Sequence, residues 1–157
     1  MALTLRERFP YNRPATMITK IEHIGIAVKD LEERIAFYRD VLGLRLEGRE
    51  DLPERNLRIA VFHLDGVRLE LLEPTSPDSN IAAFIEKRGE GLHHIAFGDD
   101  DVKGTLHRLS EAGVGLLDRE PRPGAAGTKV AFLDPKSTFH VLMELCEKER
   151  RPGGQPK

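Results

Sequence analysis

The sequence contains an internal repeat, and this repeat limits the fold more than any other feature. Residues 21–44, IEHIGIAVKDLEERIAFYRDVLGL, are matched by residues 92–116, LHHIAFGDDDVKGTLHRLSEAGVGL. Each copy begins with a short apolar strand that carries a histidine near its start, passes an acidic break, and enters an amphipathic helix that ends at glycine. Two copies of this kind predict one duplicated structural unit.

The strand segments separate bulky residues from small ones with a period of two. In the first copy the bulky residues alternate with a histidine and two small residues, His23, Gly25 and Ala27. The second copy repeats this pattern with His94, Ala96 and Gly98. Because successive side chains of a strand point to opposite faces, each histidine shares its face with small residues and has open space in front of it.

Further strands are expected to complete each copy. In the first copy these are a strand over residues 44–50 and a hairpin over residues 57–73 that turns at Asp65-Gly66. In the second copy, strands are expected over residues 129–133 and 141–146, after a Pro- and Gly-rich loop. Each copy is therefore predicted to be a βαβββ module, and the fold class to be α+β with a curved mixed sheet.

Length and composition indicate one domain. A chain of 157 residues with 39% hydrophobic content can bury one core but not two large ones. We expect a single domain over residues 21–147, with modules at about 21–73 and 92–147 and a connector with a short helix over 74–91. Residues 1–20 are expected to form a flexible extension and residues 148–157 a disordered tail, because both are polar and interrupted by proline.

Charge and cysteine content argue against several functions. Charged residues make up 32% of the chain but nearly cancel, to a net charge of -2, so no nucleic-acid surface is indicated. Because no apolar run suits a signal peptide or a membrane span, we expect a soluble, cytoplasmic protein with no membrane contact. The single cysteine, Cys146, fits a reducing compartment and excludes an intrachain disulfide.

Two glutamates interrupt strands that are otherwise apolar, Glu70 in the first copy and Glu144 at the same place in the second. A single histidine or glutamate of this kind is more often exposed or ion-paired, as Glu70 would be with Arg68. The four residues of the repeat nevertheless form a set of two imidazoles and two carboxylates: His23, Glu70, His94 and Glu144. Such a set suits a six-coordinate divalent transition metal with two positions left for substrate or water. The cation would also offset the cost of burying two carboxylates.

The repeat and several local segments resemble a known family. The double βαβββ pattern resembles the vicinal-oxygen-chelate, or glyoxalase-like, superfamily. Within it, the segments EHIGIAVKDLEERIAFYRDVLGL, LELLEPTSPDSNIAAFIEKRGEGLHHIAF and EPRPGAAGTKVAFLDPKS resemble the methylmalonyl-CoA epimerases, over about residues 21–147. The resemblance implies the glyoxalase/bleomycin-resistance/dioxygenase-like fold around a metal site, a homodimer, a coenzyme A thioester as substrate and a place in propionate metabolism.

The same resemblance implies a ligand set and a reaction. His23, Glu70, His94 and Glu144 would bind one divalent metal ion, with Co2+ as the first choice and Ni2+, Mn2+ or Zn2+ as alternatives. The reaction would be a 1,1-proton transfer at C2 that interconverts (R)- and (S)-methylmalonyl-CoA through an enolate, whose negative charge a Lewis acid stabilises. Inversion of C2 requires two acid/base groups, or one group and a relayed water.

Glu144 is the expected first acid/base group, because its counterpart in the resembling enzymes acts as both ligand and base. Several relatives carry a carboxylate at the position of Ile59, which cannot transfer protons. We take Glu70 as the first candidate for the second group. The alternative is His63, which lies in the same register as Ile59 and would otherwise be a solvated residue at a strand end.

The turn DPKS is expected to border the substrate. Lys136 and Ser137 are the predicted contacts of its carboxylate or thioester. Phe139 and His140 follow where the family often has Gly-Gly, so they either narrow the entrance or are exposed loop substitutions. The candidate contacts for the phosphates of coenzyme A are Arg119, Arg122 and Lys129.

Two other functions stay open at this point. A glyoxalase I also uses His, Glu, His and Glu with a divalent metal, but it isomerises a glutathione hemithioacetal; the EPRPG and GEGLHHIAF segments count against it. A metal-free module of the same fold that binds a small molecule would have no need of the four ligands.

Overall fold

The computed structural model describes Glu7 and residues 18–148. It divides into two compact units. The N-terminal unit is Ile21–Ala96, and the C-terminal unit contains residues 97–148 together with residues 18–20. Strands β1 (Ile18–Ala27) and β5 (Gly91–Asp99) each run from one unit into the other.

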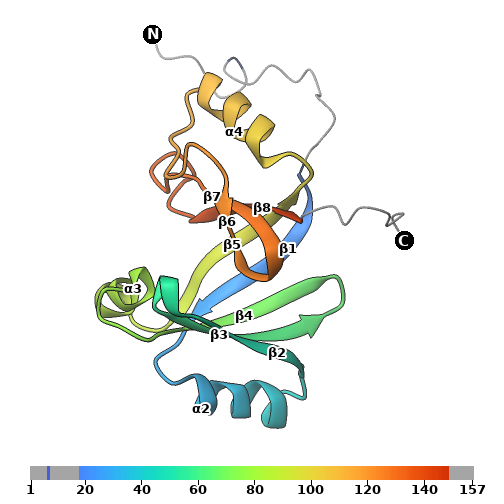
Figure 1. The fold of residues 1–157 in the computed structure, drawn as a ribbon, viewed down its shortest axis with the longest axis vertical. Helices are drawn as coiled ribbons and strands as arrows, with labels where there is room; N and C mark the ends of the chain where they lie inside the picture. The colour runs from blue at the N-terminus through green and yellow to red at the C-terminus, as the bar shows by residue number, and fades with distance from the viewer. Residues whose placement is uncertain (1–6, 8–17, 149–157) are drawn as a thin grey trace. The chain divides into compact units, whose positions relative to one another are not determined.

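The N-terminal unit is a mixed sheet with strand order β2-β3-β4-β1-β5 (Figure 1). Strand β1 runs parallel to β4, whereas β2, β3 and β4 form an antiparallel meander. The elements between β1 and β5 are α2 (Leu31–Ala36), η1 (Phe37–Val41), β2 (Arg45–Leu52), η2 (Pro53–Arg55), β3 (Leu57–Leu64), β4 (Val67–Pro74) and α3 (Asn80–Arg88). The expected hairpin is confirmed, and Gly66 in its turn has a φ of +77°.

The first helix differs from its prediction, because the amphipathic stripe does not continue as one α-helix. Asp30 caps α2 by accepting a hydrogen bond of 2.9 Å from the N–H of Glu33. After Ala36 the chain widens into the π-helical turn η1, in which the N–H of Leu42 donates to the carbonyl of Phe37 at 3.1 Å. Gly43, with a φ of +72°, ends the segment as predicted.

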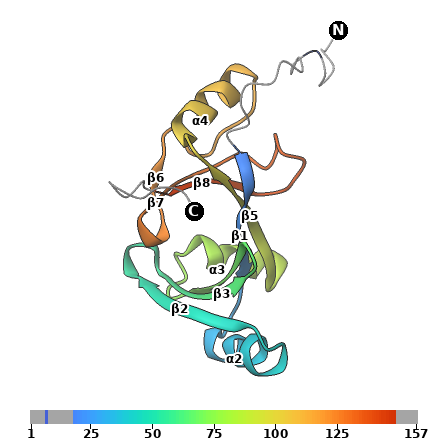
Figure 2. The same cartoon turned by 90° about the vertical axis from the view of Figure 1, so that its right-hand side faces the viewer.

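One apolar cluster holds the N-terminal unit together. Leu31 and Ile35 of α2 pack with Phe62 of β3 and Leu71 of β4 in this cluster, and α2 lies on one side of the sheet (Figure 2). Because successive side chains of β3 and β4 point to opposite faces, the residues between those of the cluster lie on the face that α2 does not cover. The helix therefore fixes which sheet face is available for a functional site.

The C-terminal unit has the strand order β5-β8-β7-β6. Its elements after β5 are α4 (Val102–Glu111), β6 (Arg122–Pro123), η3 (Ala125–Gly127), β7 (Thr128–Phe132) and β8 (Met143–Lys148). Val102 and Leu106 of α4 pack with Ala131 and Leu145 in a second apolar cluster. The predicted strands are confirmed, although β8 begins at Met143 rather than at residue 141.

The short strand β6 lies in a segment that was expected to be a loop. Arg122 pairs with Val130 and Pro123 with Lys129, at the edge of the strand order. An edge is where a strand tolerates proline, because no neighbour needs the missing N–H.

The N-terminal extension was expected to reach residue 20, but Ile18–Lys20 already belong to β1. Lys148 likewise closes β8 instead of starting a tail. The remaining residues of both predicted terminal segments lie outside the described residues. Within residues 18–148, no helix is long and apolar enough to cross a membrane.

The turn between β7 and β8 holds two consecutive residues in the left-handed region. Phe139 has a φ of 56° and His140 a φ of 68°, and the Phe139 side chain is 76% exposed. Side chains with a Cβ pay about 1–2 kcal/mol for this conformation, which glycine adopts freely. The structure thus explains why Gly-Gly suits this turn in the resembling family, and it shows that Phe139-His140 strains the backbone.

We predict that the double variant Phe139→Gly/His140→Gly raises the free energy of unfolding by about 1 kcal/mol, because the relief of strain exceeds the added entropy of the unfolded chain. Urea denaturation followed by circular dichroism measures this. Lys136→Gly, in the same turn but without a positive φ, should lower stability instead. Equal destabilisation of both variants would contradict the assignment of strain.

Candidate metal centre

Three polar side chains of the N-terminal unit lie buried on neighbouring strands. Glu70 lies on β4, His23 on β1 and His94 on β5, and these strands are adjacent in the sheet. These residues are only 5%, 5% and 7% exposed, in the order given. In the parallel register Gly25 lies beside Glu70 and His23 beside Arg68, on the face that α2 does not cover. The predicted alternation of these strands is therefore confirmed.

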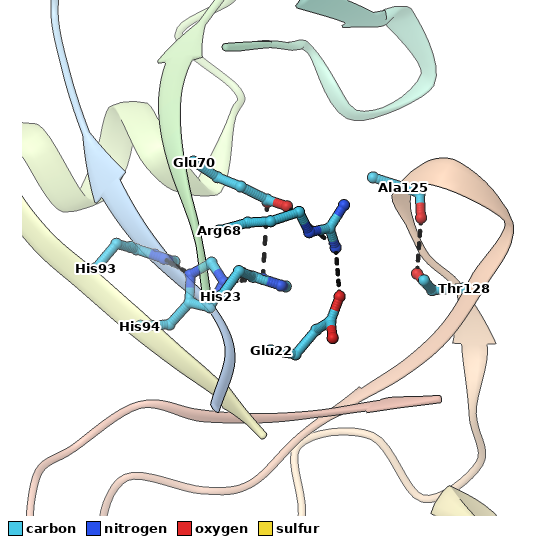
Figure 3. Close-up of polar contacts among 8 residues, drawn as sticks. All are labelled: Glu22, His23, Arg68, Glu70, His93, His94, Ala125 and Thr128. Carbon is cyan, nitrogen blue, oxygen red and sulfur yellow. Dashed lines mark hydrogen bonds and ion pairs between the residues drawn. The ribbon is translucent and has the colours of Figure 1, made fainter. Parts of the chain in front are cut away.

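The three side chains point toward one another (Figure 3). The Nε2 atoms of His23 and His94 are 3.0 Å apart, and the Nε2 of His23 lies 3.7 Å from Oε2 of Glu70. The two imidazole rings meet edge to face, with centroids 5.1 Å apart. The Nε2 of His23 is thus close to a second ring nitrogen and to a carboxylate oxygen, and both are atoms that a metal ion can bind.

Gly25 makes this arrangement possible. A Cβ atom at Gly25 would lie 2.3 Å from Cε1 and 2.5 Å from Nδ1 of His94, closer than atoms approach in proteins. The small residue expected on the histidine face is therefore required by the ring of the other histidine.

Burial keeps both histidines neutral. It lowers the pKa of His23 to about 4, with the nearby Arg68 charge acting in the same direction. It also places the pKa of His94 well below its usual range. A neutral imidazole has a lone pair to offer, so both rings are in the protonation state that a metal ion requires.

The carboxyl group of Glu70 is destabilised in its charged form. Burial raises the pKa of Glu70 to about 7; the Arg68 charge acts against this, and the negative charges of Glu50 and Glu22 add to it. A divalent cation at the adjacent imidazoles would remove this penalty. The donor set, the neutral rings and the only partly compensated carboxylate all fit a divalent transition metal.

Arg68 is engaged mainly with another residue. Its Nη2 donates to Oε1 of Glu22 at 2.8 Å, whereas its distance to Oε1 of Glu70 is 3.7 Å (Figure 3). Glu22 is itself buried, so the guanidinium is largely neutralised there. A simple Arg68–Glu70 ion pair therefore does not account for the burial of Glu70.

His93 supports the site, and the sequence analysis did not single it out. Its Nδ1 lies 2.9 Å from Nδ1 of His94, and its ring packs edge-on against Phe84 of α3. Burial lowers the pKa of His93 to about 4. Because a ligand histidine is oriented by the partner of its second nitrogen, His93 fixes the ring of His94. The doubled histidine in GEGLHHIAF was the available signal.

Glu144 lies on β8 in the C-terminal unit. It is 5% exposed and pairs in register with Phe132 of β7, while its neighbour Leu145 packs in the apolar cluster of that unit. The alternation predicted for this strand, with Leu145 on the core side and Glu144 on the other, is thus observed. Glu144 repeats within its own unit the buried position that Glu70 has on β4.

The predicted substrate contacts also lie in the C-terminal unit. Lys136 is exposed, and the Oγ of Ser137 accepts a hydrogen bond of 2.8 Å from the N–H of Gly115. The Ser137 hydroxyl therefore keeps its proton for another acceptor.

The candidate phosphate contacts divide into two kinds. Arg119 and Lys129 are exposed, whereas Arg122 is held by Asp118 at 3.2 Å and stacks over the ring of Phe132.

The candidates for the second proton-transfer group differ in position. His63 is exposed at the end of β3, next to Arg45 and Arg68 in the register. Ile59 is 3% exposed and pairs with Glu50 of β2. The face of Glu50 is not predictable from the sequence, because a strand with a bulge cannot be assigned to a face by counting.

Comparison with known proteins identifies the superfamily. The model of the Glyoxalase/Bleomycin resistance protein/Dioxygenase superfamily matches residues 22–132. An uncharacterized protein of Bacillus subtilis is 45% identical over 83% of this chain and 93% of its own. The ethylmalonyl-CoA/methylmalonyl-CoA epimerase of Cereibacter sphaeroides is 39% identical over 82% of this chain and 98% of its own.

A solved structure agrees with these relatives. A variant of the Streptomyces coelicolor methylmalonyl-CoA epimerase in complex with 2-nitronate-propionyl-CoA is 40% identical, with a TM-score of 0.79 over 85% of this chain and 99% of that one. The lactoylglutathione lyase of Haemophilus influenzae is a more distant relative, 32% identical over 86% of this chain. The predicted fold class is confirmed.

We predict that Gly25→Ala abolishes stoichiometric metal retention, because its methyl group displaces the ring of His94. Elemental analysis of the purified variant measures the metal content. Gly48→Ala is the matched control, since a Cβ there meets nothing within 4 Å. Full metal content in Gly25→Ala would contradict the close approach of the ring.

Metal-free protein should respond to the charge of Glu70. The pKa of Glu70 is about 7 in the folded protein, against an ordinary value of 4.5, so the unfolded chain loses this proton more readily. The buried carboxyl group therefore destabilises the folded protein increasingly as the pH rises from about 4.5 through about 7. Glu70→Gln should therefore raise the free energy of unfolding of the metal-free protein by about 1–3 kcal/mol at pH 8 and by little at pH 5. Chemical denaturation at the two pH values tests this, with the exposed Glu47→Gln as control. An equal effect at both pH values would contradict the assignment.

Proposed function

The chain belongs to the Glyoxalase/Bleomycin resistance protein/Dioxygenase superfamily, and from this premise we propose that it is a methylmalonyl-CoA epimerase. The enzyme is an isomerase that moves a proton at C2 of a malonyl-type coenzyme A thioester and interconverts the (R) and (S) forms. The observation that carries this proposal is the buried His23–His94–Glu70 cluster, in a chain whose relatives at 39–40% identity include epimerases.

The cluster and the superfamily indicate a divalent metal site. We propose that Glu144 joins His23, His94 and Glu70 as a ligand; the support is its equivalent place in the repeat and its burial on β8. Co2+ is the proposed metal, with Ni2+, Mn2+ or Zn2+ as alternatives, since imidazole and carboxylate together suit all of them. When bound, the cation supplies Lewis-acid stabilisation of the negative charge that develops on the thioester oxygen.

The residues of the chain then have separate tasks. Glu144 takes or returns the C2 proton on one side of the substrate, as proposed from the resemblance. Glu70 is the first sequence-based candidate for the other side. His63 is the second candidate, but its exposed position offers no desolvated contact with a substrate.

The proposed substrate contacts follow from the turn after β7. The exposed ammonium of Lys136 attracts the substrate carboxylate, and the Ser137 hydroxyl donates to the carboxylate or the thioester oxygen while its oxygen accepts from Gly115. Arg119 and Lys129 are available for the phosphates of coenzyme A.

Two accompanying proposals rest on resemblance and composition. The active form is a homodimer, and it acts in the cytoplasm in propionate metabolism. The buried free thiol of Cys146 is consistent with a reducing compartment. Analytical ultracentrifugation of the metal-loaded protein tests the assembly.

Glyoxalase I is the alternative within the same superfamily, and its named relatives are more distant than the epimerases. A metal-free binding module is disfavoured, because burying His94 and Glu70 at 3.0 and 3.7 Å from His23 would destabilise a fold that has no ion to bind.

We predict metal-dependent exchange of the C2 proton of methylmalonyl-CoA with solvent deuterium, measured by mass spectrometry for each enantiomer. Chelation should abolish the exchange and added Co2+ should restore it. Glu144→Gln should lower the rate by about 10²–10⁴-fold, the usual contribution of a general acid or base. His94→Ala should lose metal and activity together.

The control substrate is methylglyoxal with glutathione, which should not turn over. Turnover of the hemithioacetal without exchange at C2 would assign the chain to the glyoxalase I reaction instead. A metal-replete and fully active His94→Ala would overturn the ligand assignment.

A further inference from the structure

Strand β2 contains a β-bulge that changes which way its later residues point. Leu46 pairs with Phe62, but the next registered pair is Gly48 with Val61, so the register shifts at Glu47. Leu46 packs against the apolar cluster under α2. Without the bulge, Glu50 would share the face of Leu46, because residues two apart point the same way. Bulges often re-aim a side chain next to a functional site.

After the bulge, Glu50 lies on the face of the metal centre. It pairs with Ile59, and the next residue on that face of β3, Val61, pairs with Glu70. Glu70 in turn lies beside Gly25, on the face of His23. Directly paired residues share a face, so Glu50 and Glu70 belong to one surface, two strand spacings or about 10 Å apart across the sheet.

The neighbouring residue confirms this direction independently. Arg49 pairs with the fully buried Ala60, and its guanidinium contacts Glu32 of α2. Arg49 thus points to the helix-covered face, which places Glu50 on the opposite one. Glu50 is only partly exposed there, and its charge is felt by the Glu70 carboxyl.

We infer that Glu50 is the second proton-transfer group of the epimerase, delivered to the substrate from β2 by the bulge. This inference rests on the proposed function. Glu50 lies on β2, directly beside Ile59 of β3. It therefore places a carboxylate next to the position at which several relatives carry one and this chain has an isoleucine. Ile59 and Val61 form the apolar surface over which the Glu50 carboxylate reaches the substrate.

The reaction removes one proton from C2 and returns one proton to its opposite face. One glutamate carboxylate accepts the C2 proton, and the electron pair of the broken C–H bond is delocalised into the thioester as an enolate. The protonated carboxyl on the other side gives its proton to C2, which forms the new C–H bond. Glu144 and Glu50 exchange these roles between the two enantiomers, and the protons re-equilibrate with solvent.

Glu50 suits this task better than the two candidates from the sequence. Glu70 is turned toward His23 at 3.7 Å and is proposed as a ligand of the same ion as Glu144, whereas the second proton-transfer group must act on the opposite face of C2. His63 lies at the strand end among Arg45 and Arg68. Glu50, by contrast, is a partly buried carboxylate on the face of the metal centre. No ion pair of Glu50 is among the described interactions.

The decisive variant is Glu50→Gln, compared with wild type, Glu47→Gln and Glu50→Asp at matched Co2+ content. Epimerisation should fall about 10²–10⁴-fold in Glu50→Gln, while solvent deuterium still enters from one enantiomer through the remaining base. Glu47→Gln, an exposed residue of the bulge, should retain the wild-type rate. Glu50→Asp should recover part of the lost rate, which a purely structural role of Glu50 would not require.

The outcomes separate the inference from the function on which it rests. Wild-type epimerisation in Glu50→Gln would overturn the role of Glu50 and leave the proposed function intact. Equal loss of exchange from both enantiomers in Glu50→Gln would also overturn it, because one face alone should be affected. Absence of exchange in the metal-replete wild-type protein would instead refute the proposed function.

Discussion

The structure of the N-terminal unit depends on burying two imidazoles and a carboxylate side by side. His23, His94 and Glu70 come from three adjacent strands and are almost fully shielded from water. Their pKa shifts show the cost of this burial: the rings give up their charge, and the carboxyl resists ionisation. Arg68 offsets the cost at Glu70 only in part, because its closer contact is with Glu22. A divalent cation is the simplest component that makes the burial favourable.

The surrounding residues serve this cluster in different ways. Gly25 leaves room for the ring of His94, and His93 holds that ring by its second nitrogen. Helix α2 covers the opposite face of the sheet with apolar contacts, which leaves one face for chemistry. The bulge at Glu47 then directs Glu50 to that face. Each feature is local, and together they place polar groups where the sheet would otherwise carry a second apolar layer.

Much of this was predictable from the sequence, because the repeat fixes strand phase. The alternation around His23 and His94 places both histidines on one face, and the comparisons confirm the superfamily and the fold class. What could not be predicted depends on irregular geometry. The bulge in β2 changes which face its later residues point to, so the face of Glu50 cannot be obtained by counting. The contact of His93 with His94 depends on the orientation of the two rings. The π-helical turn η1 and the short strand β6 also carry no periodic signal.

The central claim is that this cluster exists to hold one metal ion. The most direct measurement is a titration of the metal-free protein with Co2+, followed by calorimetry and visible absorption. The account predicts one tightly bound ion per chain with the weak bands of six-coordinate cobalt, both lost in His94→Ala. Absence of saturable binding in the folded wild-type protein, or binding that survives in His94→Ala, would contradict it.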